Sequence, residues 1–222
     1  MKRIVTFSAI VLSTAVLFGS CRKNSMVGRG SVESETRTLS SFTSIEANGS
    51  TDIEIYASNT NKVIVTGYGN LIPIYETEVH GKTLHLEFKE GYWNIRNNNI
   101  KVTVYTTDMN AIHLNGSGNV NIHEDMNAHS MEVDVNGSGN IYIDNNKFDN
   151  FDCKINGSGN VKARAAECDD VYAKISGSGD IEITVNDLLD ARISGSGDID
   201  YWGSPEVVNT DVSGSGKVTK RN

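Results

Sequence analysis

The chain has 222 residues, a formal net charge of −8 and a pI near 5.1, so it lacks the excess of Lys and Arg that binds phosphates. We therefore exclude nucleic acid as a partner. Gly is abundant, at 21 residues, whereas 7% of the residues are aromatic, a composition that favours many tight turns around a thin aliphatic core.

The first residues have the layout of an export signal. Lys2 and Arg3 form a positively charged start, and residues 4–18 form an apolar stretch. This stretch is too short and wrongly flanked for a stable membrane span, so it is typical of a cleaved signal peptide.

The residues around Cys21 indicate lipidation. Gly19 and Ser20 stand directly before Cys21, which resembles the bacterial lipoprotein signal, although Phe18 stands where an aliphatic residue is more common. We predict a lipoprotein signal peptide over 1–20 and acylation of Cys21, so that acyl chains anchor the protein to the membrane. The alternative is an ordinary secretory peptide that is cleaved nearby, with Cys21 incidental.

The residues after Cys21 mix charge, Gly and Ser without an apolar period. We interpret 21–35 as a flexible tether and 36–222 as a single folded domain.

A repeat of about twenty residues dominates the second half of the chain. The triplet Gly-Ser-Gly recurs at spacings of 21, 20, 20, 18 and 19 residues, at 116–118, 137–139, 157–159, 177–179, 195–197 and 214–216. Aliphatic residues return at fixed phases around each triplet and alternate with polar ones, as in Ile175 before and Ile181 after the fourth copy. Each copy therefore predicts two short strands, each with one buried face, joined at a Gly-rich corner.

Return of the same residue type at the same phase favours a solenoid over a meander, because equivalent positions then stack in parallel strands one rung apart. We predict an all-β solenoid with about twenty residues per rung and Gly-Ser-Gly corners. The segment 38–110 is interpreted as a less regular version of it, since Ile53 and Ile55 follow Gly49 at the same offsets. Within this segment, 90–99 is expected to be a protruding polar loop.

These residues carry a family resemblance. Residues 42–49 (FTSIEANG), 63–67 (VIVTG) and the later NGSGN and SGSGD units resemble the head GIN domain of putative auto-transporter adhesins. The resemblance covers nearly all of the mature chain. It implies a right-handed parallel β-helix, an envelope lipoprotein and a role in adhesion, and it supplies no catalytic or ligand residues.

The acidic residues after two of the triplets are the best candidates for chemistry. Asp180 and Asp198 occupy equivalent positions, with Glu182 and Asp200 two residues on. A glycan-processing site would need such clustered carboxylates, and a Ca²⁺ site would need Asp in more than two of the six copies. Because the repeat register places no cation beside them, we interpret the four as a solvated column and expect no metal and no cofactor.

Other reactive residues receive structural interpretations. Cys153 falls on an inward position and is expected to be a buried free thiol, with a disulfide to Cys168 as the alternative. The five His residues have no metal-ligand spacing. One outward column of basic residues can pair with neighbouring acids or bind an anionic glycan; it consists of Lys154, Lys174 and Arg192.

We therefore predict a non-catalytic envelope lipoprotein at the outer membrane, facing the periplasm or the surface. It would act as an adhesin or binding module whose repeated polar faces bind a polysaccharide, peptidoglycan or a protein. An accessory scaffold in envelope signalling or stress is the first alternative, for which 90–99 would be the contact patch. A glycan-processing enzyme is the second.

Overall fold

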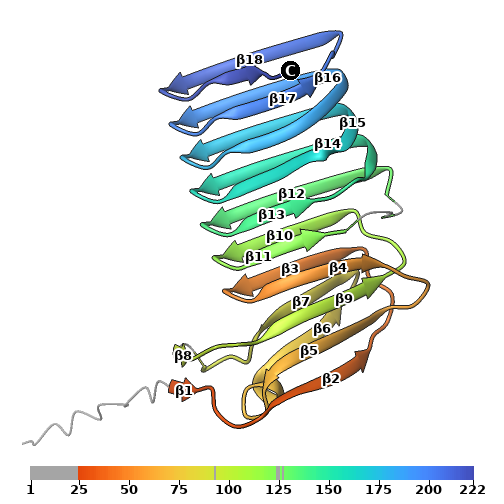
Figure 1. The fold of residues 1–222 in the computed structure, drawn as a ribbon, viewed down its shortest axis with the longest axis vertical. Coiled ribbons are helices and arrows are strands. Elements are labelled where there is room, and N and C mark those ends of the chain that lie inside the picture. The colour runs from red at the N-terminus through yellow and green to blue at the C-terminus, as the bar shows by residue number, and fades with distance from the viewer. Residues whose placement is uncertain (1–24, 93, 124–125, 127) are drawn as a thin grey trace, which may run out of the picture.

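The computed structural model describes residues 25–92, 94–123, 126 and 128–222. The ribbon is an elongated stack of layers above a broader base (Figure 1). From residue 111 onward, parallel pairings recur every 17–21 residues, as in His113 with Asp134 and Cys168 with Val185. The predicted all-β solenoid with about twenty residues per rung is confirmed.

Each rung contributes one strand to each of two faces. The strands before the corners form the first face: β3 (Ser44–Gly49), β10 (Ala111–Gly116), β12 (Ser130–Gly137), the later parts of β14 (Lys147–Gly157), β15 (Asn160–Gly177) and β16 (Ile181–Gly195), and β18 (Val207–Gly214). The strands after the corners form the second face: β4 (Asp52–Ala57), β11 (Asn119–Ile122), β13 (Asn140–Ile143), the starts of β15 and β16, β17 (Ile199–Gly203) and β19 (Val218–Lys220).

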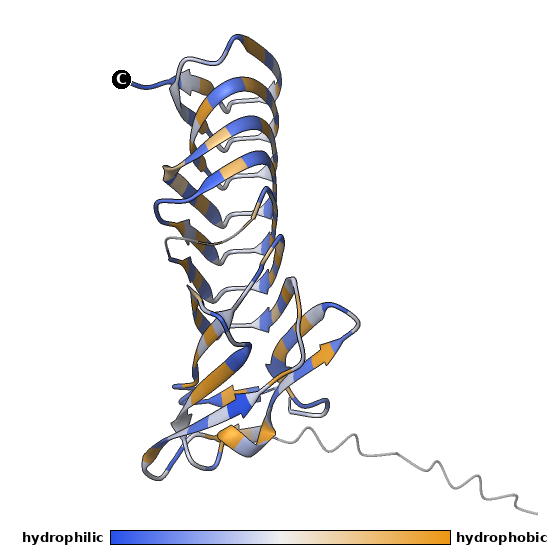
Figure 2. Cartoon of the chain, turned by 90° about the vertical axis from the view of Figure 1, so that its right-hand side faces the viewer, coloured by the Kyte–Doolittle hydropathy of each residue, from blue (hydrophilic) through white to orange (hydrophobic). Residues whose placement is uncertain are grey.

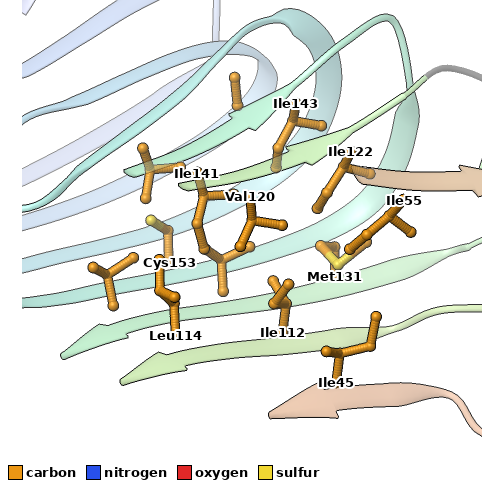
Figure 3. Close-up of a cluster of buried hydrophobic side chains, with 14 of the residues drawn as sticks. Ile45, Ile55, Ile112, Leu114, Val120, Ile122, Met131, Ile141, Ile143 and Cys153 are labelled. Atoms are coloured by element: carbon orange, nitrogen blue, oxygen red, sulfur yellow. The ribbon is translucent and has the colours of Figure 1, made fainter. Parts of the chain in front are cut away.

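The core is a set of aliphatic columns between the two faces. Polar and apolar residues alternate along the strands, and equivalent apolar side chains lie one above another, as Val120 and Ile141 do (Figures 2 and 3). Ile181 is fully buried and Ile193 is 3% exposed, whereas Arg192 faces solvent. The predicted strand phase is therefore confirmed. Removing each such side chain from water contributes roughly 1.5–3 kcal/mol.

The corners need glycine for two different reasons. Gly177 has a φ of +140°, a conformation that a Cβ penalises. At Gly179 the reason is space, because a Cβ there would overlap the carbonyl oxygen of Gly159 in the preceding rung. Between them, the backbone N–H of Ser178 donates to the carbonyl oxygen of Gly157 at 2.8 Å. Successive corners thus stack backbone on backbone.

The base departs from the predicted solenoid. β3 and β4 form a regular rung against β10 and β11, which confirms the phase of Ile53 and Ile55. The rest of 38–110 contains antiparallel pairings, so its interpretation as a less regular solenoid is wrong. Its elements are β5 (Lys62–Tyr68), the 3₁₀ turn Ile72–Ile74, β6 (Tyr75–His80), β7 (Thr83–Phe88), β8 (Asn94–Arg96) and β9 (Lys101–Thr106).

The base extends both faces beyond the first rung. β7 lies parallel to β3 and carries β6 on its other side in an antiparallel hairpin. β9 lies parallel to β4 and carries β5, which pairs antiparallel with both β9 and β2 (Val32–Thr38). These strands close the lower end of the solenoid (Figure 1).

The expected tether over 21–35 is wrong for its later part. β1 (Ser25–Val27) pairs with β8, and β2 pairs with β5 over seven residues. The folded domain therefore includes the segment from residue 25, because backbone groups of these strands find partners in the base. Residues 21–24, with the predicted lipidation site Cys21, lie outside the described residues.

Candidate functional site

Asp180 and Asp198 lie on the solvent side of the second face, and each accepts a hydrogen bond from a backbone N–H of the next rung. Oδ1 of Asp180 accepts the N–H of Asp198 at 2.8 Å, and Oδ1 of Asp198 accepts the N–H of Lys217 at 2.8 Å. Asn160 does the same for the N–H of Asp180 at 2.9 Å. The two carboxylates therefore continue an amide ladder that holds successive rungs together.

The expectation that no cation lies beside the acidic residues is wrong. Glu182 lies 3.6 Å from the ammonium of Lys162, which occupies the same register position one rung earlier. Asp200 lies 2.9 Å from the guanidinium of Arg221. Among the described residues, no group of three or more His, Cys, Asp or Glu side chains gathers as metal ligands would.

This geometry predicts that Ca²⁺ does not stabilise the fold through the acidic column. We expect equal melting temperatures, within about 1 °C, in EDTA and in millimolar Ca²⁺ at matched ionic strength. A bound ion at a hundred times its Kd would add about 2.7 kcal/mol. A rise of several degrees that disappears in Asp180→Asn/Asp198→Asn would identify a metal site.

Two of the three cysteines, Cys153 and Cys168, are structural. Cys153 and Cys168 are free thiols and fully buried in the core. Burial raises the pKa of the Cys168 thiol to about 12 and raises that of Cys153 as well, with nearby carboxylates adding to both shifts. At neutral pH neither supplies a thiolate nucleophile, and the alternative of a disulfide between them is not realised.

The histidines pair with carboxylates instead of gathering at one site. Nδ1 of His113 lies 3.1 Å from Asp134. The ring of His123 lies between Glu54, 2.7 Å from Nε2, and Asp144, 3.1 Å from Nδ1. Its face stacks on Tyr56 with ring centroids 4.2 Å apart. Sequence reasoning missed this cluster, which links three neighbouring strand layers.

The expected protruding loop at 90–99 is partly ordered into the base. β8 lies within it and pairs with β1. The side-chain amide of Asn97 donates to the carbonyl of Gly28 at 2.8 Å. This segment thus holds the first described strand, β1, against the base.

The first face carries a shallow groove of about 220 Å³ over three successive rungs. Its central rung presents Tyr172 and Lys174 from β15, both pointing outward. In the rung on either side, an acidic residue occupies the register position of Tyr172 and a basic residue occupies that of Lys174. The flanking pairs are Asp152 with Lys154 on β14 and Asp190 with Arg192 on β16.

The charges in the groove are unevenly matched. Lys154 lies 3.3 Å from Asp152, and Arg192 binds both carboxylate oxygens of Asp190 at 2.9 and 3.1 Å. Partial burial is the largest single influence on the pKa of Lys154 and lowers it. The hydrogen bond with Asp152 and the charges of Asp152, Asp134 and Glu132 together outweigh it, so the pKa lies above its usual value. No acidic group among the described residues lies within ion-pair distance of Lys174.

The central rung is therefore open to a ligand. Tyr172 is 47% exposed, which is high for a large aromatic residue. Together the groove offers one aromatic ring, one ammonium without a partner and two carboxylates that can accept further hydrogen bonds. These are the groups that recognise a polyhydroxylated, negatively charged molecule.

Only half of this groove was predicted from the sequence. The repeat register located the basic column, whose cations could either pair with acids or bind an anion. In the structure Lys154 and Arg192 pair with acids, and Lys174 has no acid within ion-pair distance among the described residues. Asp152, Tyr172 and Asp190 were missed, although each stands five residues before its triplet and the repeat register would have placed them beside the cations.

Comparison with known proteins identifies the family. The family model described as "Putative auto-transporter adhesin, head GIN domain" matches residues 41–205. The chain belongs to this family. The resemblance seen in the sequence is thereby confirmed. A comparison with curated proteins finds no match.

Solved structures share the fold of this head GIN domain. A putative adhesin from Bacteroides fragilis is 21% identical with a TM-score of 0.71, and the match covers 88% of this chain and 100% of that one. A putative lipid binding protein from Parabacteroides distasonis is 25% identical with a TM-score of 0.59, over 89% of this chain and 99% of that one. Among the described residues, no helix has the length and apolarity to cross a bilayer.

Proposed function

We propose that the chain is a non-catalytic, lipid-anchored adhesin of the bacterial outer membrane that binds an acidic polysaccharide in the groove of the first face. Family membership supports an adhesin-like role at the envelope or cell surface. The observation that carries the ligand class is the central rung, where the exposed Tyr172 ring stands beside the unpaired ammonium of Lys174.

Each part of the groove has a role in this proposal. The Tyr172 ring packs against the C–H face of a sugar ring, and Lys174 pairs with its carboxylate or sulfate group. Asp152 and Asp190 accept hydrogen bonds from hydroxyl groups while holding Lys154 and Arg192 in place. A single exposed charge pair is weak and screened by salt, so useful affinity comes from several adhesins acting on one polymer.

The proposal is tested with a glycan panel and matched variants. The purified chain is expected to bind acidic glycans better than neutral ones, with affinity that falls as salt is raised. Lys174→Glu and Tyr172→Ala should each weaken binding at least tenfold. The controls are Lys101→Glu and Tyr142→Ala, which make the same changes on exposed residues of the second face. Equal losses in variants and controls, or binding only to neutral glycans or proteins, would contradict the proposal.

The proposed anchor gives a separate prediction. We expect Cys21→Ser to release the chain from the membrane fraction and to abolish labelling by a fatty-acid analogue, because the thiol that accepts the acyl group is gone. Membrane fractionation and gel fluorescence measure both effects. Cys153→Ser is the matched control and should stay labelled, since Cys153 is fully buried in the folded domain. Retained label in Cys21→Ser would refute lipidation at this residue.

A further inference from the structure

Among the described residues, nothing covers the core columns at the upper end of the solenoid. Val208 and Val212 in β18 stand directly above Leu189 and Ile193, on the inward phase of the first face. Leu189 is fully buried and Ile193 is 3% exposed, but Val208 and Val212 are each 41% exposed. The pattern that buries every lower rung thus continues into a layer with nothing above it among the described residues (Figure 1).

The same layer presents free strand edges. β18 pairs with β16 and β19 pairs with β17, and the described residues provide no strand on the outer side of either. At the lower end, in contrast, the antiparallel strands of the base cover the first rung. A row of unpaired backbone N–H and C=O groups beside exposed valines fits another β-strand.

The charges of the two edges differ in sign. Glu206 and Asp211 lie at or next to the β18 edge, which is acidic. The β19 edge is basic and carries Lys217, Lys220 and Arg221. A strand added to β18 should therefore be basic, and a strand added to β19 should be acidic. A second copy of this chain supplies both at once.

We propose that two copies join end to end through this layer, with β18 of each copy paired to β19 of the other. A two-fold axis along the strand direction exchanges the two faces and makes both pairings antiparallel. Val212 and Val218 stand two residues before and after the same corner, so each lies opposite the other across the axis. In this register Asp211 lies between the second copy's Lys217 and Arg221.

This dimer would account for both the exposed valines and the free strand edges at the upper end of the solenoid. It buries Val208, Val212 and Val218 in a core shared by both copies. It also pairs both free edges. Because each copy uses the same surface, the contact closes at a dimer and does not propagate into a fibre. The groove of the first face lies outside this contact, so the dimer proposal and the glycan-binding proposal can be tested independently.

The oligomeric state of the purified chain tests the proposal, measured by sedimentation equilibrium over a range of concentrations. We expect a dimer, and we expect Val212→Asp to raise its Kd at least a hundredfold by placing two charges in the shared core. Val207→Asp is the matched control. Val207 is an exposed valine of the same strand that points outward. It lies beyond the stretch of β18 that would pair with β19 of the second copy, so the dimer should persist.

Charge exchange tests the pairing of β18 with β19. Asp211→Lys should weaken the dimer tenfold or more, and adding Lys217→Glu to it should restore most of the affinity. Because Val212 and Asp211 are already exposed, melting curves should show folded monomers for both variants. A monomer at all concentrations, a dimer that tolerates Val212→Asp, or the absence of rescue by Lys217→Glu would overturn the proposal.

Discussion

Replacing Ile181 by Asp is expected to lower the free energy of unfolding by roughly 4 kcal/mol. Ile181 is fully buried between Val161 and Ile199 in one aliphatic column. A carboxylate at this position would lose its hydration without gaining a partner, which is among the costliest single changes. Urea unfolding followed by circular dichroism measures the change.

The neighbouring residue provides the control. Glu182 points outward, and its pair with Lys162 is long and partly exposed. Pairs of this kind contribute at most about 1 kcal/mol, so Glu182→Ala should have a small effect. Comparable losses for the two variants would contradict the strand register, because a shift by one residue exchanges the inward and outward positions.

Replacing Gly179 by Ala is expected to lower the free energy of unfolding by about 3 kcal/mol. The added Cβ would meet the carbonyl oxygen of Gly159 in the preceding rung. That oxygen belongs to stacked backbone, which cannot move aside as a flexible side chain can. Thermal or urea unfolding of the purified variant measures the loss.

Ser178 lies between the two corner glycines and is exposed. Its hydrogen bond to the preceding rung uses the backbone N–H, so Ser178→Ala should change stability by no more than about 0.5 kcal/mol. If Gly179→Ala were as mild as Ser178→Ala, the corners would not be packed backbone against backbone.

The regular part of the fold was predictable because one short pattern recurs. A fixed period of about twenty residues and strict alternation around Gly-Ser-Gly determine which residues face inward and which strands stack. The base was not predictable in this way. Val63 and Val102 alternate with polar residues as solenoid strands do, but β5 and β9 pair antiparallel. Alternation of polar and apolar residues indicates that one face of a strand is buried. It is the same in parallel and antiparallel strands, so it does not predict the direction of pairing.

The candidate site was predictable to the extent that it follows the register. The outward column of Lys154, Lys174 and Arg192 could be placed from sequence. Which of these cations finds an acid depends on side-chain conformations and on the neighbouring column. The register itself places Lys162 one rung before Glu182, so that pair was predictable and was missed. Arg221 lies just beyond β19, where the repeat pattern no longer assigns positions, and its pair with Asp200 was missed for that reason. β1 escaped detection because its partner, β8, lies about seventy residues away, as in the pairing of Ser25 with Asn94.

A crystal structure of the chain with the best-bound acidic oligosaccharide would test the central claim most directly. The account predicts a sugar ring over Tyr172, with its carboxylate or sulfate within hydrogen-bond distance of Nζ of Lys174. It also predicts that the Asp152–Lys154 and Asp190–Arg192 pairs remain in place on either side. A ligand bound on the second face or at the base, with the groove empty, would contradict it.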